Sequence, residues 1–582
     1  MRMLKRLLRW MVKTALILVV LFLIISISQY LSHRYKPGSV LVLKLDGPVV
    51  ERSTTNALGM LSPDQTALNV IRRSLRAAGT DDRIVGLAIK VFDPQMELAQ
   101  AQELCAMITE FRSHGKWTTA YMETAGEGSF GNLPFMVAST ADEVSMMPQG
   151  ELNILGVGMR EMFARGLLDW IKVNPNFASI GKYKDAANIF TEKDFTPAQR
   201  EEDESLMGSM FDQMTAESAA HRHITADQMR AIVDRAPLTA SDGLKAHLLD
   251  RLEYEDQFDD RVEKYRGEHH ETIDASSYVR SAGPHFGGGD KIAVIYGVGA
   301  IQRGAGGFDP ILSPGSEAMG SDDMVKAFKD AREDDSVRGV VFRVDSPGGS
   351  VIASELIRRA VELTAAKKPV VVSMSSYAAS GGYWVSTPAA AIISDPGTLT
   401  GSIGVLGGKF NVSGAATAIG VNTGAVSRGA NALMYDSFSD FTPAQDQIFR
   451  DQLLGGTYQY FLQIVAKQRH MTVAQVNDVA QGRVWTGDQA LKVNLVDKLG
   501  GLSDAIDQAK KLAKLDPESH PQLEELPEEV GFLGKLLNGQ IAGTVAQWQP
   551  PRAIAPLIAL VGEIVARHAE MGQVYCPVVP LM

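Results

Sequence analysis

Residues 370–384, VVVSMSSYAASGGYW, join an apolar run typical of a β-strand to a turn of small residues around Ser380. About 30 residues earlier, the apolar run 340–342 leads in the same way into Asp345-Ser346-Pro347-Gly348-Gly349. A serine at a strand-to-helix junction can expose its hydroxyl group, and a glycine pair can present bare backbone N–H groups to the same place. The two segments therefore predict a nucleophile and an oxyanion hole, two main requirements of acyl-transfer chemistry.

The sequence around these motifs alternates between short apolar strands and helical segments. We expect strands at 291–296, 339–344 and 369–374, and helices at 322–334 and 350–367. Such alternation predicts an α/β fold with a largely parallel central sheet.

The chain also contains an internal repeat. Phe195-Thr-Pro-Ala-Gln199 recurs as Phe441-Thr-Pro-Ala-Gln445, and residues 239–252 resemble residues 486–499. The period of about 250 residues is too long for a solenoid unit and predicts two related domains. The predicted organisation is a basic segment at 1–13, an anchor at 14–31, a first repeat at 38–265, a linker at 266–289, a second repeat at 290–510 and a tail at 511–582.

The predicted anchor, residues 14–31, is an uncharged apolar run just long enough to cross a bilayer as a helix. Lys5, Arg6, Arg9 and Lys13 lie before it, which predicts a cytoplasmic N-terminus and an exported body. A cleaved signal peptide is the alternative. We favour the anchor, because the run is long for a signal-peptide core and Ser26-Ile27-Ser28 is a poor cleavage site.

The composition argues against several classes of function. The net charge of −11 disfavours a nucleic-acid-binding surface, which would normally be basic. The two cysteines, Cys105 and Cys576, provide neither a disulfide framework nor a metal-ligand cluster. We therefore expect no nucleic-acid partner, no metal and no cofactor.

Alignment of the two repeats indicates that they have lost complementary parts. Gly348-Gly349 falls on Gln95-Met96, and the Ser380 region falls on residues 131–134, so the first repeat lacks the nucleophile and the glycine pair. Conversely, Lys184 of the first repeat falls on Ala430. Division of one active site between the two copies explains this pattern more economically than neutral drift.

The base that would activate Ser380 is not adjacent to it in sequence. A Ser-His-Asp triad is one alternative, but no histidine that follows Ser380 lies in a Gly-rich or strand-end context; these are His470, His520 and His568. Five earlier histidines look like surface or helix positions: His221, His223, His247, His269 and His270. We therefore favour a lysine, and Lys184 in particular because of the complementary loss.

A lysine base must be neutral to accept a proton. Its reference pKa of about 10.4 would have to fall by roughly three units, which corresponds to about 4 kcal/mol. Burial can supply a shift of that size. Ser-Lys pairs are a known variant of the triad arrangement.

Taken together, the motifs resemble the signal peptide peptidase A (protease IV) family in its long, duplicated, membrane-anchored bacterial form. The resemblance covers the anchor and both repeats and is carried by Asp345–Ser350, Ala379–Tyr383, Leu399–Gly404 and Gly181–Asp185. It implies a serine endopeptidase with a Ser-Lys dyad, built on two tandem ClpP/crotonase-like (ββα-spiral) domains. It further implies degradation of residual signal peptides and other small apolar peptides.

The resemblance also implies roles for individual residues. Ser380 would be the nucleophile and Lys184 the general base, with Lys182 a nearby lysine that takes no part. The backbone N–H groups of Gly349 and Gly381 would form the oxyanion hole. Two further positions are Ser402, which would orient the lysine, and Asp185, which replaces a serine of other members. A carboxylate on the amine would raise the lysine pKa, so we predict that Asp185 points away.

The family resemblance implies a setting as well. We expect a single-pass protein of the bacterial inner membrane with a cytoplasmic N-terminus and a periplasmic body. We also expect contact with membrane lipid, and a homotetramer whose sites face an apolar cavity. The competing interpretations are a crotonase-like acyl-CoA enzyme and a catalytically inactive membrane scaffold. The sequence leaves open whether Lys184 and Ser380 meet within one chain or between chains.

Overall fold

The structure is a computed structural model that describes residues 36–53, 65–281, 289–308, 317–516, 519 and 521–527. The predicted basic segment 1–13 and anchor 14–31 lie outside the described residues. So does the end of the predicted tail, from residue 528 onwards. Among the described residues, no helix is long and apolar enough to cross a membrane.

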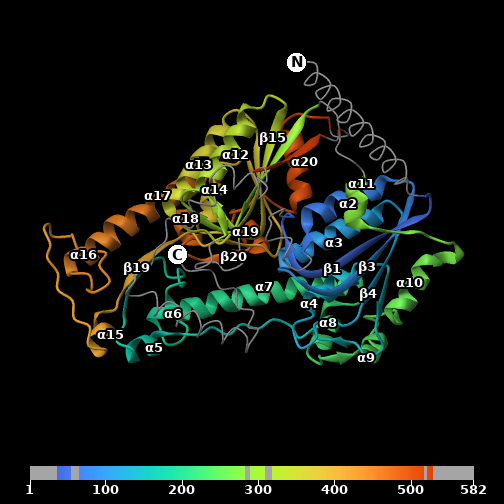
Figure 1. Ribbon diagram of the computed structural model, residues 1–582, viewed down its shortest axis with the longest axis horizontal. Coiled ribbons are helices and arrows are strands. Elements are labelled where there is room, and N and C mark those ends of the chain that lie inside the picture. The colour runs from blue at the N-terminus through green and yellow to red at the C-terminus, as the bar shows by residue number, and fades with distance from the viewer. Residues whose placement is uncertain are drawn as a thin grey trace, which may run out of the picture.

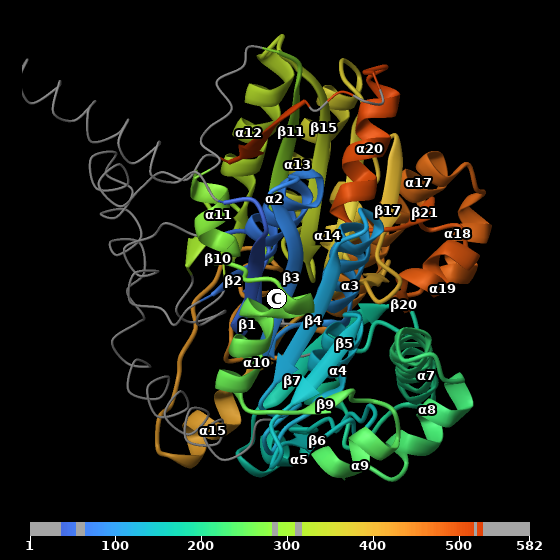
Figure 2. The same cartoon turned by 90° about the vertical axis from the view of Figure 1, so that its right-hand side faces the viewer.

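Two sheets with the same strand order form the body of the molecule (Figure 1, Figure 2). The first runs β10 (Thr272–Asp274), β1 (Ser39–Val50), β3 (Ile84–Gln95), β4 (Trp117–Met122), β5 (Glu143–Met146) and β9 (Arg251–Leu252). The second contains the equivalent series β22 (Gln522–Leu526), β11 (Lys291–Val298), β15 (Val337–Ser346), β16 (Val370–Ala379), β17 (Ala391–Ser394) and β21 (Lys498–Leu499). From β16 this sheet also continues through β18 (Leu399–Gly401) to β20 (Val484–Thr486). Neighbours in both series pair in parallel, which confirms the mixed α/β fold.

The apolar strands of the second repeat are buried on both faces. Val340 and Phe342 of β15 pack in one core with helices α12 (Ser321–Glu333) and α13 (Val351–Ala365). Val341, between them, packs in another core with α20 (Leu502–Leu512). Parallel strands covered on both sides are apolar throughout, which explains the continuous Val/Ile runs of this sequence. The strands and helices predicted for this region are confirmed.

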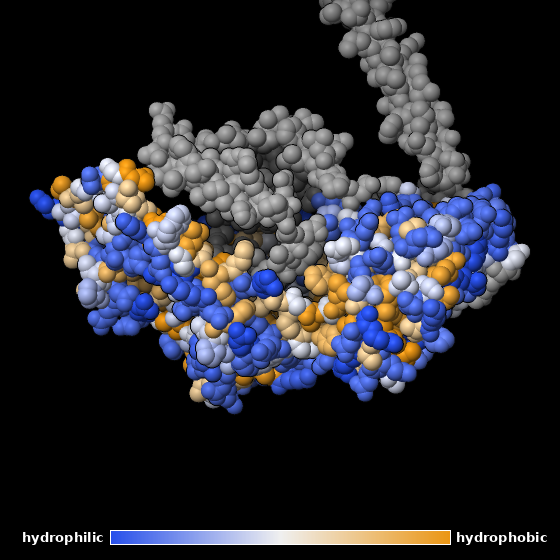
Figure 3. Space-filling model, turned by 90° about the horizontal axis from the view of Figure 1, so that it is seen from below, coloured by the Kyte–Doolittle hydropathy of each residue, from blue (hydrophilic) through white to orange (hydrophobic). Residues whose placement is uncertain are grey.

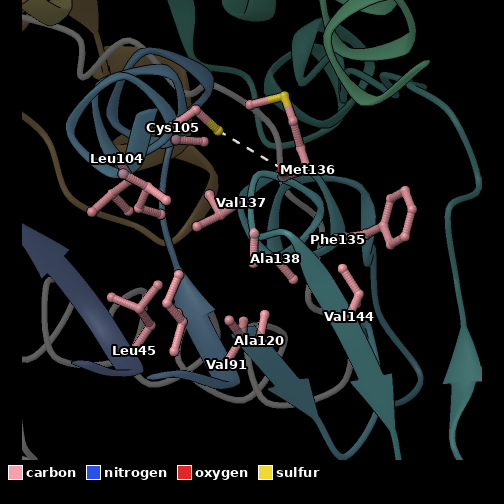
Figure 4. Close-up of a cluster of buried hydrophobic side chains, with 14 of the residues drawn as sticks. Leu45, Val91, Leu104, Cys105, Ala120, Phe135, Met136, Val137, Ala138 and Val144 are labelled. Atoms are coloured by element: carbon pink, nitrogen blue, oxygen red, sulfur yellow. Dashed lines mark hydrogen bonds between the residues drawn. The ribbon is translucent and has the colours of Figure 1, made fainter. Parts of the chain in front are cut away.

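The first repeat has a comparable core, part of which Figure 4 shows. Helices α3 (Leu98–Ser113) and α4 (Asn132–Ser139) pack together over the first sheet, with Leu104 near Val91 of β3. The Sγ atom of Cys105 lies 3.8 Å from the backbone oxygen of Met136, which accepts its weak hydrogen bond. Cys105 is therefore a packing residue in this core.

Both repeats extend beyond the predicted boundaries. Strand β10 pairs with β1, and helix α11 (Ala275–Ser281) packs against α2 (Leu68–Thr80), so the first half of the predicted linker 266–289 belongs to the first repeat. Strand β22 pairs with β11, so the predicted tail 511–582 contributes a strand to the second sheet. These are short strands that contain polar residues, and without an apolar run they gave no sequence signal.

Two elements cross from one repeat to the other. Strand β7 (Asn174–Ile180) of the first repeat pairs antiparallel with β19 (Val405–Asn411) of the second along its whole length. The long helix α7 (Pro197–His221) then runs along the underside of the molecule and contacts β20 (Val484–Thr486) of the second repeat (Figure 1). The repeats are therefore joined by an exchange of elements as well as by packing.

A buried ionic cluster joins the two repeats at their centre. The side chain of Arg343 on β15 is completely buried. Its Nε donates to Glu51 at 2.7 Å, and its Nη2 donates to Glu103 at 2.8 Å. Both carboxylates come from the first repeat, while Ser373 and Ser375 of the second accept further hydrogen bonds from the same guanidinium at 2.8 and 3.0 Å. Every side of the buried cation is thus paired.

Candidate active site

Ser380 lies at the junction between β16 and helix α14 (Gly381–Ser386). Its φ and ψ angles are 53° and −114°, a conformation that residues other than glycine rarely adopt. The backbone N–H of Ser380 donates to the Gly401 oxygen at 2.9 Å, and the Trp384 N–H donates to the Ser380 oxygen at 2.9 Å. The sharp turn holds the half-buried serine at the end of the strand, and such strain is typical of functional positions.

The Gly348-Gly349 turn packs its backbone directly against Ser380. A Cβ atom on Gly348 would lie 2.9 Å from the Ser380 Cβ and 2.6 Å from the Gly381 nitrogen. Both glycines also have positive φ angles, 104° and 145°. Only glycine can therefore occupy these positions without displacing the serine turn.

Two backbone N–H groups are available beside the serine. Ile301 donates to the Gly348 oxygen and accepts from the Ser350 N–H, so the N–H of Gly349 between them faces away from that bridge. Gly381 is the first residue of α14, where an N–H has no acceptor within the helix. The arrangement can present both donors to a developing oxyanion.

The amine of Lys184 lies next to the serine hydroxyl. Its Nζ is 3.2 Å from Ser380 Oγ, 2.8 Å from Ser402 Oγ and 3.2 Å from the Ser402 backbone oxygen. Lys184 and Ser380 thus meet within one chain, which answers the question left open by the sequence. Lys182 is exposed, and its Nζ lies over the ring of Tyr183 at 4.7 Å.

Burial lowers the pKa of Lys184 to about 8. The charges of Asp185 and Glu202 act in the opposite direction and raise it. Among the described residues no ion pair joins Asp185 to Lys184, although the charge of Asp185 is the larger of the two effects that raise the Lys184 pKa. That the Asp185 carboxylate points away from the amine stays a prediction. Burial also raises the pKa of Glu202 itself, to about 9.

A further glycine, Gly482, fixes the position of the lysine, and no sequence motif marks it. Gly181 directly follows strand β7, and the N–H of Tyr183 donates to the Gln481 oxygen at 2.9 Å. A Cβ atom on Gly482 would lie 2.6 Å from both Cα and Cβ of Lys184. The loop of the second repeat can approach the lysine backbone this closely only because residue 482 has no side chain.

With this geometry in place, the comparison with known proteins is informative. A family model described as Peptidase family S49 matches residues 110–267 and 362–516, one segment in each repeat. The chain belongs to peptidase family S49. It is therefore a serine protease.

Full-length relatives support the same assignment. Protease 4 of Salmonella typhi is 31% identical over 562 residues, which cover 91% of this chain and 88% of that protein. The chloroplastic serine protease SPPA of Arabidopsis thaliana is 28% identical over 515 residues, 87% of this chain and 74% of that protein. Similarity to solved structures is weak: a mutant of ClpP1 from Listeria monocytogenes covers 37% of this chain and 94% of its own at 13% identity, with a TM-score of 0.24. None of these relatives supports the acyl-CoA enzyme or the inactive scaffold.

In this S49 peptidase, one face of α7 holds the strand that positions Ser402. Glu201 makes a bidentate ion pair with Arg483 at 2.8 Å, and the carboxylate of Glu202 accepts from the Val484 N–H. The Arg483 backbone oxygen in turn accepts from the Ser402 N–H at 2.7 Å. Further along the same face, Ser205 accepts from Gln489 at 3.0 Å and Ser209 lies 2.9 Å from the Thr486 hydroxyl. These contacts could not be predicted from sequence, since a polar stripe on a helix normally faces solvent.

The described histidines of the S49 peptidase are engaged elsewhere or exposed. The Nδ1 of His221 lies 3.2 Å from Ser139 Oγ. His270 was expected at a surface or helix position, which is wrong: it is buried outside any helix, with Nδ1 2.7 Å from the Gly38 oxygen. His223, His247, His269 and His470 are exposed, whereas His520 and His568 lie outside the described residues. Lysine is thus the basic side chain found at Ser380.

Proposed function

We propose that this S49 peptidase cleaves peptide bonds with a dyad of Ser380 and Lys184. The observation that carries the proposal is the 3.2 Å contact between Lys184 Nζ and Ser380 Oγ, at a buried lysine whose pKa is lowered. Neutral Lys184 accepts the proton of the Ser380 hydroxyl as Oγ attacks the carbonyl carbon of the substrate. Ser402 accepts a hydrogen bond from the amine and holds it toward Ser380.

The same groups serve the later steps. The N–H groups of Gly349 and Gly381 stabilise the oxyanion of the tetrahedral intermediate. The protonated amine of Lys184 then donates its proton to the leaving nitrogen, and the peptide bond breaks to give an acyl-enzyme. In the second half of the reaction, Lys184 takes a proton from a water molecule that attacks the ester, and Ser380 is released.

We further propose a membrane setting and a substrate class. Residual signal peptides and other small apolar peptides are the proposed substrates, supported by the resemblance to signal peptide peptidases. The basic segment 1–13 and apolar run 14–31 support a single-pass anchor in the bacterial inner membrane, in contact with lipid and with the body in the periplasm. The resemblance also supports two tandem ClpP/crotonase-like domains in each chain.

Exposed apolar side chains support self-association, for which we propose a homotetramer. Hydrophobic patches interrupt the hydrophilic surface on the face that Figure 3 shows. Large apolar residues are strongly exposed in the region of α5 (Arg165–Trp170) and α15 (Ser413–Ala418): Met162 is 80% exposed, Trp170 79%, Ile419 75% and Val426 94%. Apolar surface of this kind normally marks an interaction site.

The substrate proposal is tested with full-length protein in detergent and a synthetic signal peptide. We expect the wild type to cut the peptide within its apolar core, and to cut a peptide of equal length with a charged core much more slowly. A serine-directed acylating probe should label the wild type and should not label Ser380→Ala. Equal labelling of both proteins would mean that the nucleophile is not Ser380. An uncut signal peptide would contradict the proposal that signal peptides are substrates.

The activity should rise with pH through about 8, because Lys184 accepts a proton only in its neutral form and burial places its pKa there. Below this pKa the amine is protonated and cannot accept a proton, so the activity is low there. Asp185→Asn should move the rise to lower pH, because the charge of Asp185 raises the Lys184 pKa. The measurement is kcat/KM against pH, with Lys182→Gln as a control that leaves the profile unchanged. A profile that Asp185→Asn leaves in place would contradict the role of Lys184.

A further inference from the structure

Strand β16 contains a bulge just before the serine turn. Val344 of β15 pairs with Met374 of β16, and Ser346 pairs with Ala378. Residues 375–377 of β16 therefore lie opposite the single residue Asp345 of β15. A bulge of this kind leaves backbone groups outside the ladder, and beside an active site it commonly changes the direction of the residues that follow.

The carboxylate of Asp345 binds the backbone within this bulge. Its Oδ1 accepts the Tyr377 N–H at 2.9 Å. The main chain of Asp345 is fixed from the opposite side, because its backbone oxygen accepts the Gly299 N–H at 2.8 Å. Strand β15 thus supplies through a side chain the acceptor that a regular ladder would supply through its backbone.

The bulge also marks the point where β16 changes its neighbour. Before the bulge, residues 371–374 pair with β17, whereas Tyr377–Ala379 pair with β18. Ser402 directly follows β18, and the glycine turn 348–349 lies just beyond the end of β15. The conformation of the bulge therefore determines where Ser380 lies relative to Ser402 and to the glycine turn.

The first repeat, which lacks the nucleophile, also lacks this carboxylate. In the alignment of the two repeats, Asp345 falls on Phe92 of β3. There β3 and β4 pair in one continuous register. The fold therefore accepts an apolar side chain at this position, and the carboxylate occurs in the repeat that carries Ser380.

Asp345 contributes an acceptor oxygen rather than a charge. Burial raises the pKa of Asp345, and the charges of Glu51 and Glu97 raise it further. The Tyr377 N–H and the charge of Arg343 act in the opposite direction. In the described structure Arg343 pairs with other carboxylates, and Asp345 makes no ion pair. A negative charge is thus unfavourable here, and a neutral amide would supply the same acceptor.

We propose that Asp345 is a positioning residue: its carboxylate fixes the bulge of β16 through the Tyr377 N–H, and the bulge in turn places Ser380. Without this acceptor the bulge can shift its register, and Ser380 Oγ then loses its 3.2 Å contact with Lys184 Nζ. The inference rests on the proposed function, because the dyad is the unit that is positioned. Asp345 acts on the reaction only through the strand.

The test compares two substitutions of similar size in the full-length protein. Asp345→Asn keeps an oxygen that can accept the Tyr377 N–H, and its kcat for an apolar peptide should stay within about 3-fold of the wild type. Asp345→Leu removes the acceptor and should lower kcat about 10- to 100-fold with little change in KM, because a small displacement of a reacting group has an effect of this size. Asp335→Ala is the control: this exposed carboxylate precedes the other end of β15, and its loss should leave kcat unchanged.

A second measurement does not depend on catalysis. Hydrogen exchange of a peptide that spans residues 375–379 should be faster in Asp345→Leu than in the wild type or Asp345→Asn, because the Tyr377 N–H has lost its acceptor. The melting temperature shows whether each variant is folded. Asp345→Ala also lacks the acceptor and replaces Asp345→Leu if that variant does not fold.

Four results would overturn the proposal. They are wild-type kcat in Asp345→Leu, an equal loss of kcat in Asp345→Asn and Asp345→Leu, a rise in KM at unchanged kcat, and unchanged hydrogen exchange in Asp345→Leu. The second result would mean that the charge matters, and the third that Asp345 contacts substrate. Absence of peptide cleavage by the wild type would instead contradict the proposed function, and the exchange experiment would still test whether Asp345 holds the bulge.

Discussion

Replacing Lys184 with alanine should reduce kcat/KM for peptide cleavage by about 10³-fold or more, and Ser380→Ala should do the same. The reason is geometric: the Nζ atom of Lys184 lies 3.2 Å from Ser380 Oγ, within hydrogen-bond distance. The double variant Ser380→Ala/Lys184→Ala should be no worse than either single variant, because groups that act as a unit are not additive. The measurement is initial-rate cleavage of a synthetic apolar peptide by the full-length protein.

Lys182→Ala is the matched control for this prediction. Lys182 lies two residues from Lys184 on the same loop, yet it is exposed and lies over Tyr183. It should retain wild-type kcat/KM. The dyad would be wrong if Lys184→Ala kept normal turnover, or if Lys182→Ala lost as much activity as Lys184→Ala. Unchanged melting temperatures would show that the loss in Lys184→Ala is chemical.

The two residues of the proposed dyad could be picked out from sequence because their motifs are local. Ser380 lies in a run of small residues after an apolar strand, and Lys184 stands out because only one repeat has it. The structure brings both together, 196 positions apart in the chain. The oxyanion-hole role of Gly349 and Gly381 stays a prediction.

The residues that hold the two halves together could not be predicted, because their effect depends on a partner distant in sequence. Gly482 has no motif, and its importance appears only when its backbone meets that of Lys184. Glu202 belongs to a polar helix face that would be solvated in isolation, but it accepts from the Val484 N–H of the other repeat. Strands β10 and β22 escaped detection because a short edge strand needs no apolar run.

Arg343 gives the second large effect, and it concerns stability. We expect Arg343→Met to lower the free energy of unfolding by about 3–5 kcal/mol, because it leaves Glu51 and Glu103 buried without their counter-ion. The measurement is the denaturant midpoint of the wild type and the variant under identical conditions. Arg338→Met is the matched control: it lies on the same strand but is exposed, with Asp290 3.6 Å away, and should change stability by less than about 1 kcal/mol.

A compensated variant separates the ionic effect from simple loss of packing. Glu51→Gln and Glu103→Gln, added to Arg343→Met, remove the two uncompensated charges and should recover part of the lost stability. Failure to recover any stability would mean that the guanidinium acts through its shape. Because Arg343 lies on β15, which leads into Gly348 and Gly349, the compensated protein should still have lower kcat than the wild type. Full activity in that protein would show that the ionic cluster stabilises the contact between the two repeats without positioning the active site.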